Sequence, residues 1–247
     1  MIMKSSYRGG LDPNDMAHMP VSDPSQTSAP FTIKVADDLL APQFAPAVSG
    51  PNNGYDPAGD CDGLFMPYKM QPHNNCYNYA CDNATNSFAW PGKSNYKYPT
   101  VPGTPPPGTS ASIMWRGPDL VQAAQQDGLL LVADPGANIS DLQVPAGRTG
   151  WFLALLVAAP DANFPGGDFH WVRCDNKATF DSWSQKDGGY GVTSFDFAGK
   201  PITDPRKAIW TANDGPWKPL LVGEEDIMTT YAFYVFMFVP YPGVTIA

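Results

Sequence analysis

The sequence has little charge, and this scarcity limits what the protein can bind. Charged residues make up 16% of its 247 residues, whereas an average globular domain has roughly 25%. Lys and Arg total 15 and Asp and Glu total 24, which gives a formal net charge of −9. Proteins that bind nucleic acid neutralise its phosphates with a basic stripe. The sequence has no such stripe, so nucleic acid is not expected as a partner.

Long apolar runs are also missing. The longest, 151–159 and 231–239, have nine residues each, whereas a membrane-spanning helix needs about 20. The opening MIMKSSYRGGLDP has no apolar core of signal-peptide length. We therefore expect no membrane span and a cytoplasmic location at synthesis. Association with a virion, or export, would then use a route without a signal peptide.

Side chains that bind metals are few. The chain has three histidines and four cysteines, and no CxxC pair, so no metal site is expected. No cofactor is expected either, because the glycine pair in PGGD (165–168) leads into a predicted strand instead of a phosphate-binding helix. A Cys61–Cys81 bridge is the one disulfide considered, although a chain without a signal peptide is expected to stay in a reducing compartment.

Proline and glycine are abundant, with 27 and 23 residues. Proline inside a helix costs about 3 kcal/mol, so an all-helical bundle is not expected. Residues 1–60 contain eight prolines and no sustained apolar period. Such a segment cannot bury enough apolar surface to fold alone. We therefore expect an extended, proline-rich N-terminal arm over 1–60, which packs on its own domain or on neighbouring subunits, and a compact domain over 61–247.

The order of helical and strand patterns indicates the class of that domain. A helix is expected over 74–82, where Asn74 and Asn75 are good N-caps. A second is expected over 117–128, with Pro118 in its first turn. Apolar runs and turn signals then predict strands over 129–134, 149–160, 164–175, 180–189 and 229–240. This order predicts an α+β fold in which N-terminal helices pack on one face of an antiparallel sheet.

One cysteine and one histidine are candidates for catalysis. Cys76 stands at the start of the first predicted helix, where exposed N–H groups and the helix dipole favour a thiolate. His170 is the only histidine on a predicted strand, and a histidine beside the thiol would serve as its general base. The plainer alternative is that each is a packed structural residue. Residue spacing alone leaves both alternatives open.

Three blocks carry a resemblance to a known family. NNCYNYACDNATNSFAWPG (74–92), DFHWVRCDNKATFDSWSQKDGG (168–189) and GKPITDPRKA (199–208) resemble uncharacterised bacterial and phage-type proteins. These are similar to a divergent branch of the papain-like superfamily, near the NlpC-type amidases and peptidases. The resemblance covers roughly residues 70–240. It implies a papain-like fold with Cys76 as the nucleophile and His170 as the base.

The resemblance leaves the remaining site residues open. The family pattern W-S-H-K-P-G reads here as WSQKDG (183–188), so Gln185 stands where a histidine is expected. Either Gln185 or Asp204 would orient the imidazole, and an Asp before Pro is also a common turn former. The Cys76 backbone N–H would be one oxyanion donor, with Asn75, Asn74 or Gln71 as the second. Asn74 and Asn75 can equally be plain helix caps.

Three functions follow as hypotheses. The first is a cysteine-dependent amide hydrolase, a peptidase or amidase acting on a peptide or a peptidoglycan-type substrate through a Cys76–His170 dyad. The second is a structural or assembly component of a virion or secreted complex, which uses the same scaffold with weak or no activity. The third is an effector-type deamidase with the same Cys–His chemistry. The altered WSQKDG block favours the second, and the intact Cys and His blocks favour the first.

Overall fold

The computed structural model describes residues 32–34, 40–42, 73–103, 113–162, 164–175, 179–189, 192–213, 228–241 and 244–247. Most of the expected arm (1–60) lies outside these ranges, as do Cys61 and Gln71. Of the arm, the structure describes two strands, β1 (Thr32–Lys34) and β2 (Leu40–Pro42), which pair antiparallel.

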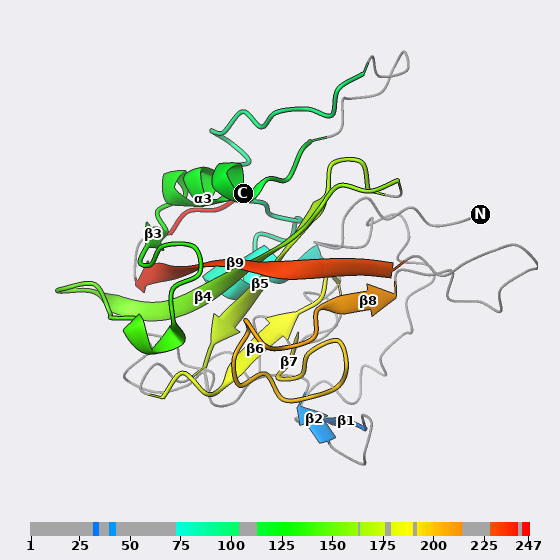
Figure 1. Ribbon diagram of the computed structural model, residues 1–247. Coiled ribbons are helices and arrows are strands. Elements are labelled where there is room, and N and C mark those ends of the chain that lie inside the picture. Colours follow the sequence, from blue (N-terminus) through cyan, green and yellow to red (C-terminus); the bar gives the residue numbers. More distant parts are fainter. Residues whose placement is uncertain are drawn as a thin grey trace, which may run out of the picture.

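A seven-stranded antiparallel sheet organises the rest of the described chain (Figure 1). Its main path runs β3-β9-β4-β5-β6-β7, and β8 pairs with β9 off that path. The strands are β3 (Leu130–Leu131), β4 (Thr149–Ala158), β5 (Asp168–Cys174), β6 (Trp183–Lys186), β7 (Val192–Thr193), β8 (Thr211–Asn213) and β9 (Met228–Tyr241). The strands predicted over 149–160 and 229–240 are confirmed as β4 and β9.

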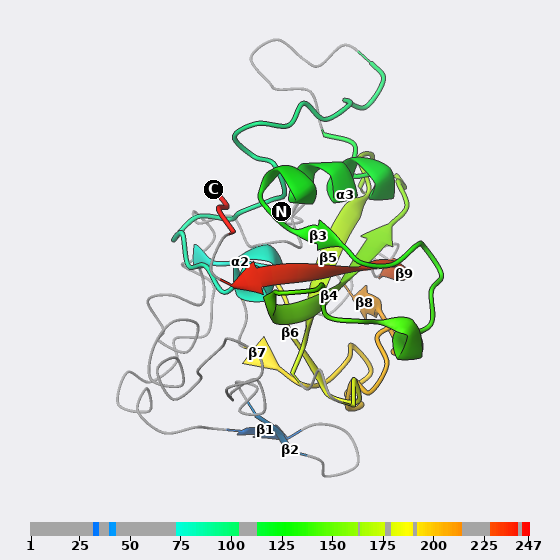
Figure 2. The ribbon, with the colours of Figure 1, turned by 90° about the vertical axis from the view of Figure 1, so that its left-hand side faces the viewer.

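Helices are few and short in the described ranges. They are α2 (Cys76–Cys81), α3 (Gly117–Gln126) and the 3₁₀ turn η6 (Ile139–Asp141). Both predicted α-helices are confirmed, the first with Asn75 as its N-cap and the second with proline in its first turn. α3 lies beside β3 in both ribbon views (Figures 1 and 2). No helix in the described part of the chain combines the length and apolar character needed to cross a membrane.

The expected fold class is wrong. A papain-like α+β domain would pack N-terminal helices over one face of its sheet, but here the two α-helices have 6 and 10 residues and the described chain is mostly antiparallel sheet. The helical patterns are real, yet they are too short to form a helical layer. The high content of proline and glycine interrupts the chain around them, and irregular segments cover much of the sheet instead.

The sheet is buried on both faces, which creates two separate cores. β4 is at its centre and pairs with β5 on one side and with β9 on the other. Because successive side chains on a strand point to opposite faces, the apolar run of β4 supplies both cores. Trp151, Leu153 and Leu155 enter one core, while Phe152, Ala154 and Leu156 enter the other.

We call these layers the α2-side core and the loop-side core. The α2-side core contains side chains of α2 and α3 packed on the sheet, including Cys76, Tyr77, Tyr79, Leu120 and Ala124. The loop-side core is closed by residues outside the helices and the long strands, namely Leu142, Ile202 and Trp210. Every residue of β5 is buried, so the position of a residue along β5 decides which core its side chain enters.

A register shift in β9 changes which residues face each core. Leu155 pairs with Val235 and Leu156 with Phe233, so Tyr234 is an extra residue at a bulge. Before the bulge Tyr231 enters the loop-side core, whereas after it Val235 enters the α2-side core. Simple alternation along the sequence would place both residues on the same face.

Substitution of Gly150 tests the close approach of β4 and β9. Gly150 has φ +145, and a Cβ there would overlap the carbonyl oxygen of Val239. We expect Gly150→Ala to lower the free energy of unfolding by about 3 kcal/mol or more, because backbone strain and a backbone clash act together. Gly147→Ala is the matched control, since Gly147 has φ +71 and open space around it. Urea unfolding should show a loss of only about 1–2 kcal/mol for the control; equal losses would contradict the packing.

Candidate functional site

Cys76 begins helix α2 but is not an exposed thiol. Its side chain is fully buried in the α2-side core. Burial raises the pKa of the Cys76 thiol far above its usual range, and the hydrogen bond from the Trp171 backbone N–H offsets only part of this effect. The expectation that the helix start produces a reactive thiolate is therefore not met, because desolvation outweighs the helix terminus.

His170 lies in an aromatic environment within the other layer. Its ring centroid is 5.6 Å from that of Phe197, 5.9 Å from that of Trp210 and 6.0 Å from that of Tyr231. Trp210 and Tyr231 belong to the loop-side core. Only 1% of His170 is exposed. The imidazole therefore lies inside the molecule, away from solvent.

The structure separates the two proposed catalytic side chains. Trp171, whose backbone N–H contacts the Cys76 thiol, lies in the α2-side core together with Phe169. His170 stands between them on β5, so its side chain points to the opposite face. The structure therefore places the Cys76 thiol and the His170 imidazole in different layers and does not bring them together as the expected dyad. The sequence placed both residues on adjacent elements, but it did not fix the face of β5 that α2 covers.

Gln185 does orient the imidazole. Its Nε2 donates to the Phe195 carbonyl at 2.7 Å, so its Oε1 is directed to His170. His170 Nε2 lies 2.7 Å from that oxygen, and because an amide oxygen only accepts, the imidazole carries a proton on Nε2. The hydrogen bond expected between these two side chains is present. It joins β5 to β6 inside the loop-side core, without the thiol nearby.

Asn75 acts as a helix cap. Its Oδ1 accepts from the backbone N–H groups of Tyr77 and Asn78, and its Nδ2 donates to the Ala89 carbonyl at 2.7 Å. Asn78 Oδ1 in turn accepts from the Asn75 N–H, which completes a capping box. These bonds occupy the amide that was considered as an oxyanion donor. Asn75 therefore has the geometry of a plain helix cap. Gln71, another candidate for the second oxyanion donor, lies outside the described residues.

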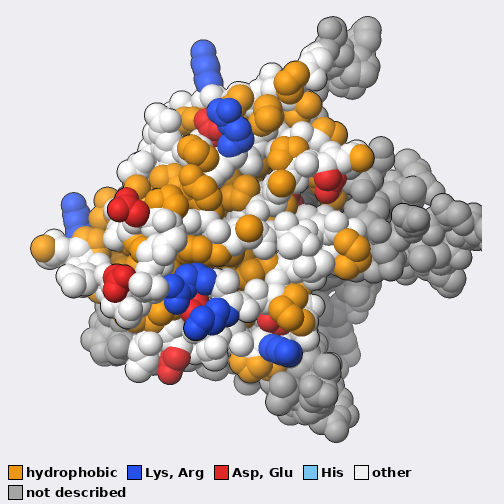
Figure 3. Space-filling view, viewed as in Figure 1, with side chains coloured by type: hydrophobic (Ala, Val, Ile, Leu, Met, Phe, Trp, Pro, Cys, Tyr) orange, Lys and Arg blue, Asp and Glu red, His pale blue; other side chains and the backbone are white. Residues whose placement is uncertain are grey.

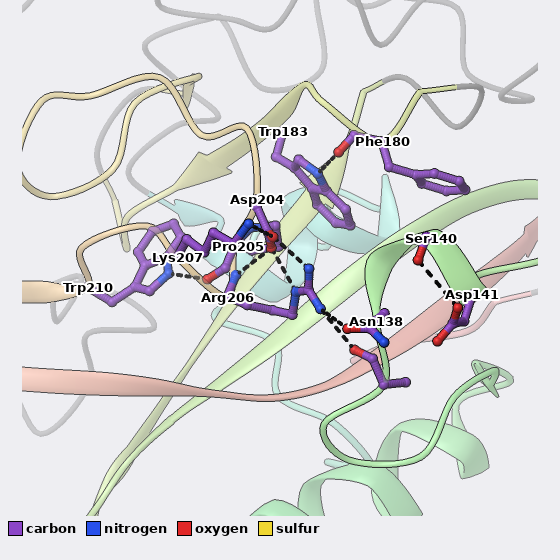
Figure 4. A network of polar contacts seen from close by, with 11 residues as sticks. Asn138, Ser140, Asp141, Phe180, Trp183, Asp204, Pro205, Arg206, Lys207 and Trp210 are labelled. Carbon is purple, nitrogen blue, oxygen red and sulfur yellow. Dashed lines mark hydrogen bonds and ion pairs between the residues drawn. The ribbon is translucent and has the colours of Figure 1, made fainter.

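Asp204 belongs to a different structural unit. Its carboxylate accepts from the Arg206 side chain at 2.7 and 2.9 Å and from the Arg206 backbone N–H at 3.0 Å (Figure 4). Arg206 also donates to Ala137 and Asn138, beside η6. The bond from Arg206 holds the pKa of Asp204 below its usual value although burial opposes it. Asp204 therefore holds Arg206 in place, and Arg206 joins this turn to the loop beside η6. Gln185, and not Asp204, accepts the hydrogen bond from His170.

Lys186 is a buried polar residue that the sequence analysis did not identify. It is fully buried, and its Nζ donates to the carbonyls of Asn74 at 2.5 Å and Gly188 at 2.6 Å. Burial lowers the pKa of Lys186 to about 7. The ammonium anchors the segment before α2 to the sheet. The signal in the sequence was weak, because lysine on a short strand normally indicates an exposed face.

A second buried network crosses from α2 to β5 and β6. The Arg173 guanidinium lies 3.8 Å from the Tyr79 ring centroid and donates to the Tyr79 carbonyl at 3.0 Å. Ser184 Oγ donates to Asp175 at 2.6 Å, so the Tyr79 hydroxyl, 2.7 Å away, is the donor in its own bond to Ser184. Burial raises the pKa of Asp175 to about 7, against the opposing charge of Arg173. These bonds fix α2 on the sheet.

The described polar clusters are better suited to holding the fold than to catalysis. Their side chains are buried and bonded to backbone carbonyls or to each other. Within the described ranges, no three His, Cys, Asp or Glu side chains gather where they could hold a metal ion. Cys81 carries a free thiol, and Cys61, its partner in the bridge expected from the sequence, lies outside the described residues.

Comparison with known proteins adds a relative. No family model matches the chain, and no solved structure gives a significant match. The chain is 33% identical over 163 residues to insoluble matrix shell protein 1 of Ruditapes philippinarum. The match covers 64% of this chain and 85% of that protein. The chain therefore belongs to the same family as this shell matrix protein. The papain-like resemblance gains no support from these comparisons.

The burial of Cys76 predicts an unreactive thiol. In the folded protein at pH 8, we expect iodoacetamide to label Cys76 at least about 100-fold more slowly than in urea-unfolded protein, because burial excludes both reagent and thiolate. Peptide mapping by mass spectrometry measures the rate, with Cys174, also buried, as the internal reference. Labelling of native Cys76 faster than the unfolded thiol would contradict this description.

The buried Lys186 predicts a particular dependence of stability on pH. Lysine in the unfolded chain keeps a pKa near 10.5, whereas in the folded protein the pKa of Lys186 is about 7. Between these values only the unfolded state holds the extra proton, so this group makes stability rise as pH increases. Between pH 7 and 9 the rise should be roughly 2–3 kcal/mol.

Urea unfolding of the wild type and of Lys186→Met at several pH values isolates this contribution. The difference in unfolding free energy between the two proteins should be constant below about pH 6 and should change in favour of the wild type above pH 7. A difference that does not vary from pH 6 to pH 9 would show that Lys186 titrates as an exposed lysine.

Proposed function

We propose that this protein is a structural component of an insoluble protein matrix. The observation that carries the proposal is the family relationship: a protein named as an insoluble matrix shell protein shares 33% identity, and the match spans 85% of its length. A match over most of that protein supports a shared role better than a match to one short motif would. The proposal corresponds to the second hypothesis from the sequence, an assembly component.

The geometry of the candidate residues supports the same proposal. A cysteine hydrolase or deamidase needs its thiol and its base within hydrogen-bond reach of each other and of the substrate. Cys76 and His170 are both buried and point into different cores. The polar residues that accompany them, Gln185 and Lys186, bind backbone carbonyls. Side chains arranged in this way are suited to stabilising the fold and poorly suited to catalysing a reaction.

The dense packing of the sheet also supports a role as a matrix protein. Both faces of the sheet are filled with large side chains, among them the fully buried Trp151, Trp171 and Trp183. Such a body is a rigid building block, since close-packed interiors resist deformation.

The decisive experiment asks whether the protein assembles, and whether assembly depends on the Cys76 thiol. The full chain and its Cys76→Ser variant are purified under denaturing conditions and refolded by dilution. The fraction that sediments is then measured over a range of protein concentrations. We expect both proteins to form sedimentable material to the same extent, within about twofold, because the thiol is a buried packing group.

Near-UV circular dichroism of the soluble and resuspended sedimented fractions serves as the control, because only native packing gives the buried Trp151, Trp171 and Trp183 a fixed aromatic signal, whereas aggregates of unfolded chain can also contain sheet. The proposal fails if the folded wild type stays soluble and monomeric at every concentration. It also fails if folded wild type, but not Cys76→Ser, releases product from a panel of peptide and peptidoglycan substrates.

A further inference from the structure

The sequence contains two Asn-x-Ser/Thr tripeptides, and the structure presents them differently. They lie at 83–85 (Asn-Ala-Thr), after α2, and at 138–140 (Asn-Ile-Ser), at η6. This tripeptide is the acceptor for N-linked glycosylation, a modification of surface loops. Because so short a motif also recurs by chance, the surroundings of each asparagine decide whether it can carry a glycan.

The turn at η6 directs both polar residues of its tripeptide outward. Asn138 and Ser140 are exposed, whereas Ile139 between them is half-buried and packs against the loop-side core. The backbone of Asn138 is extended, with φ −75 and ψ 147, where it enters the turn. Ile139 therefore anchors the segment while the amide and the hydroxyl stay accessible. Figure 4 shows the side chains of Asn138 and Ser140 on this connection between β3 and β4.

A glycan on Asn138 would preserve the contact that this side chain makes. Arg206 Nη1 donates to Asn138 Oδ1 at 3.3 Å, so the bond uses the oxygen and not Nδ2, the atom that is glycosylated. Transfer forms a bond from Nδ2 to C1 of the first sugar and breaks the C1–O bond to the pyrophosphate of a lipid-linked donor. Nδ2 gives up one of its two protons, and the lipid pyrophosphate leaves. The amide oxygen can still accept from Arg206.

The tripeptide at 83–85 belongs instead to the hydrogen bonds that follow α2. Asn78 Nδ2 donates to the Asn83 carbonyl at 3.0 Å and to Thr85 Oγ1 at 2.9 Å. Thr85 Oγ1 in turn donates to the Ser87 carbonyl at 3.1 Å. Asn83 and Thr85 are both half-buried, and Ala84 between them packs against the α2-side core. The hydroxyl of this tripeptide is therefore already bonded, and a large hydrophilic glycan beside it would crowd α2.

We propose that Asn138 carries an N-linked glycan, which projects from the turn between β3 and β4. The inference rests on the proposed function, because this transfer acts on exported chains, and a component of a matrix outside the cell is exported. A glycan on Asn138 would also overturn the cytoplasmic location expected from the sequence. Figure 3 shows the face that carries the turn, and acidic and basic side chains reach its surface close to one another. A hydrophilic glycan suits such a polar surface.

The test is the occupancy of Asn138 in the protein isolated from its natural source. Peptide-N-glycosidase in heavy-oxygen water converts a glycosylated asparagine to aspartate that carries the heavy isotope, and mass spectrometry of peptides locates the label. We expect the label on Asn138 at an occupancy at least about tenfold above that of Asn83, the internal control. An unlabelled Asn138 overturns the inference, and so does equal labelling of both asparagines. If unlabelled protein is recovered from the insoluble matrix, the proposed function stands; recovery from the soluble fraction alone contradicts that function.

Modification of the refolded full chain by an oligosaccharyltransferase, with a lipid-linked oligosaccharide as donor, tests the same site directly. The wild type and Ser140→Thr should be modified at Asn138, whereas Ser140→Ala should not, because the third residue must supply a hydroxyl. Thr85→Ala is the matched control and should leave the modification of Asn138 unchanged. Near-UV circular dichroism checks that each variant is folded. A folded wild type that is not modified at Asn138, or a Ser140→Ala variant modified as well as the wild type, contradicts the proposal.

Discussion

The structure depends on a sheet that is buried on both faces. β4 pairs with β5 and β9 along most of its length, and its alternating side chains supply two different cores. Each neighbouring strand must therefore distribute its side chains between the same two layers. On β5 this distribution sends Trp171 toward α2 and His170 toward the loop-side core. Because Cys76 packs with Trp171 on one face of β5, its thiol and the His170 imidazole lie in different layers.

Buried polar groups stabilise this arrangement at defined points. Lys186 ties the start of α2 to β6, and Gln185 ties His170 to the segment that follows β7. Each of these side chains would be costly to bury alone, but its bonds to carbonyls compensate for lost hydration. The same burial changes how these groups titrate. On a surface, a lysine or a thiol like Lys186 and Cys76 would suggest catalysis. Here both side chains are buried, and they hold α2 against the sheet.

The sequence predicted local structure better than it predicted the site. The N-cap at Asn75, the proline at the start of α3 and the apolar runs of β4 and β9 depend on neighbours in sequence, so these elements were found. The fold class expected from the sequence is wrong because the two α-helices, with 6 and 10 residues, are too short to form a layer over the sheet. The sequence could not show whether Cys76 and His170 meet, because alternation on β5 shows only that His170 and Trp171 face opposite sides. It does not show which side α2 covers. That choice depends on long-range packing, as does the bulge at Tyr234 in β9.

The face assignment of β5 is the central claim, and nuclear Overhauser effects test it most directly. In the folded protein, the account predicts contacts between the Cys76 Hβ protons and the Trp171 amide proton. It also predicts contacts between the His170 ring protons and the rings of Trp210 and Tyr231. Contacts between the His170 ring protons and the Cys76 Hβ protons would contradict it, because the thiol and the imidazole would then share one layer and a catalytic pair could form.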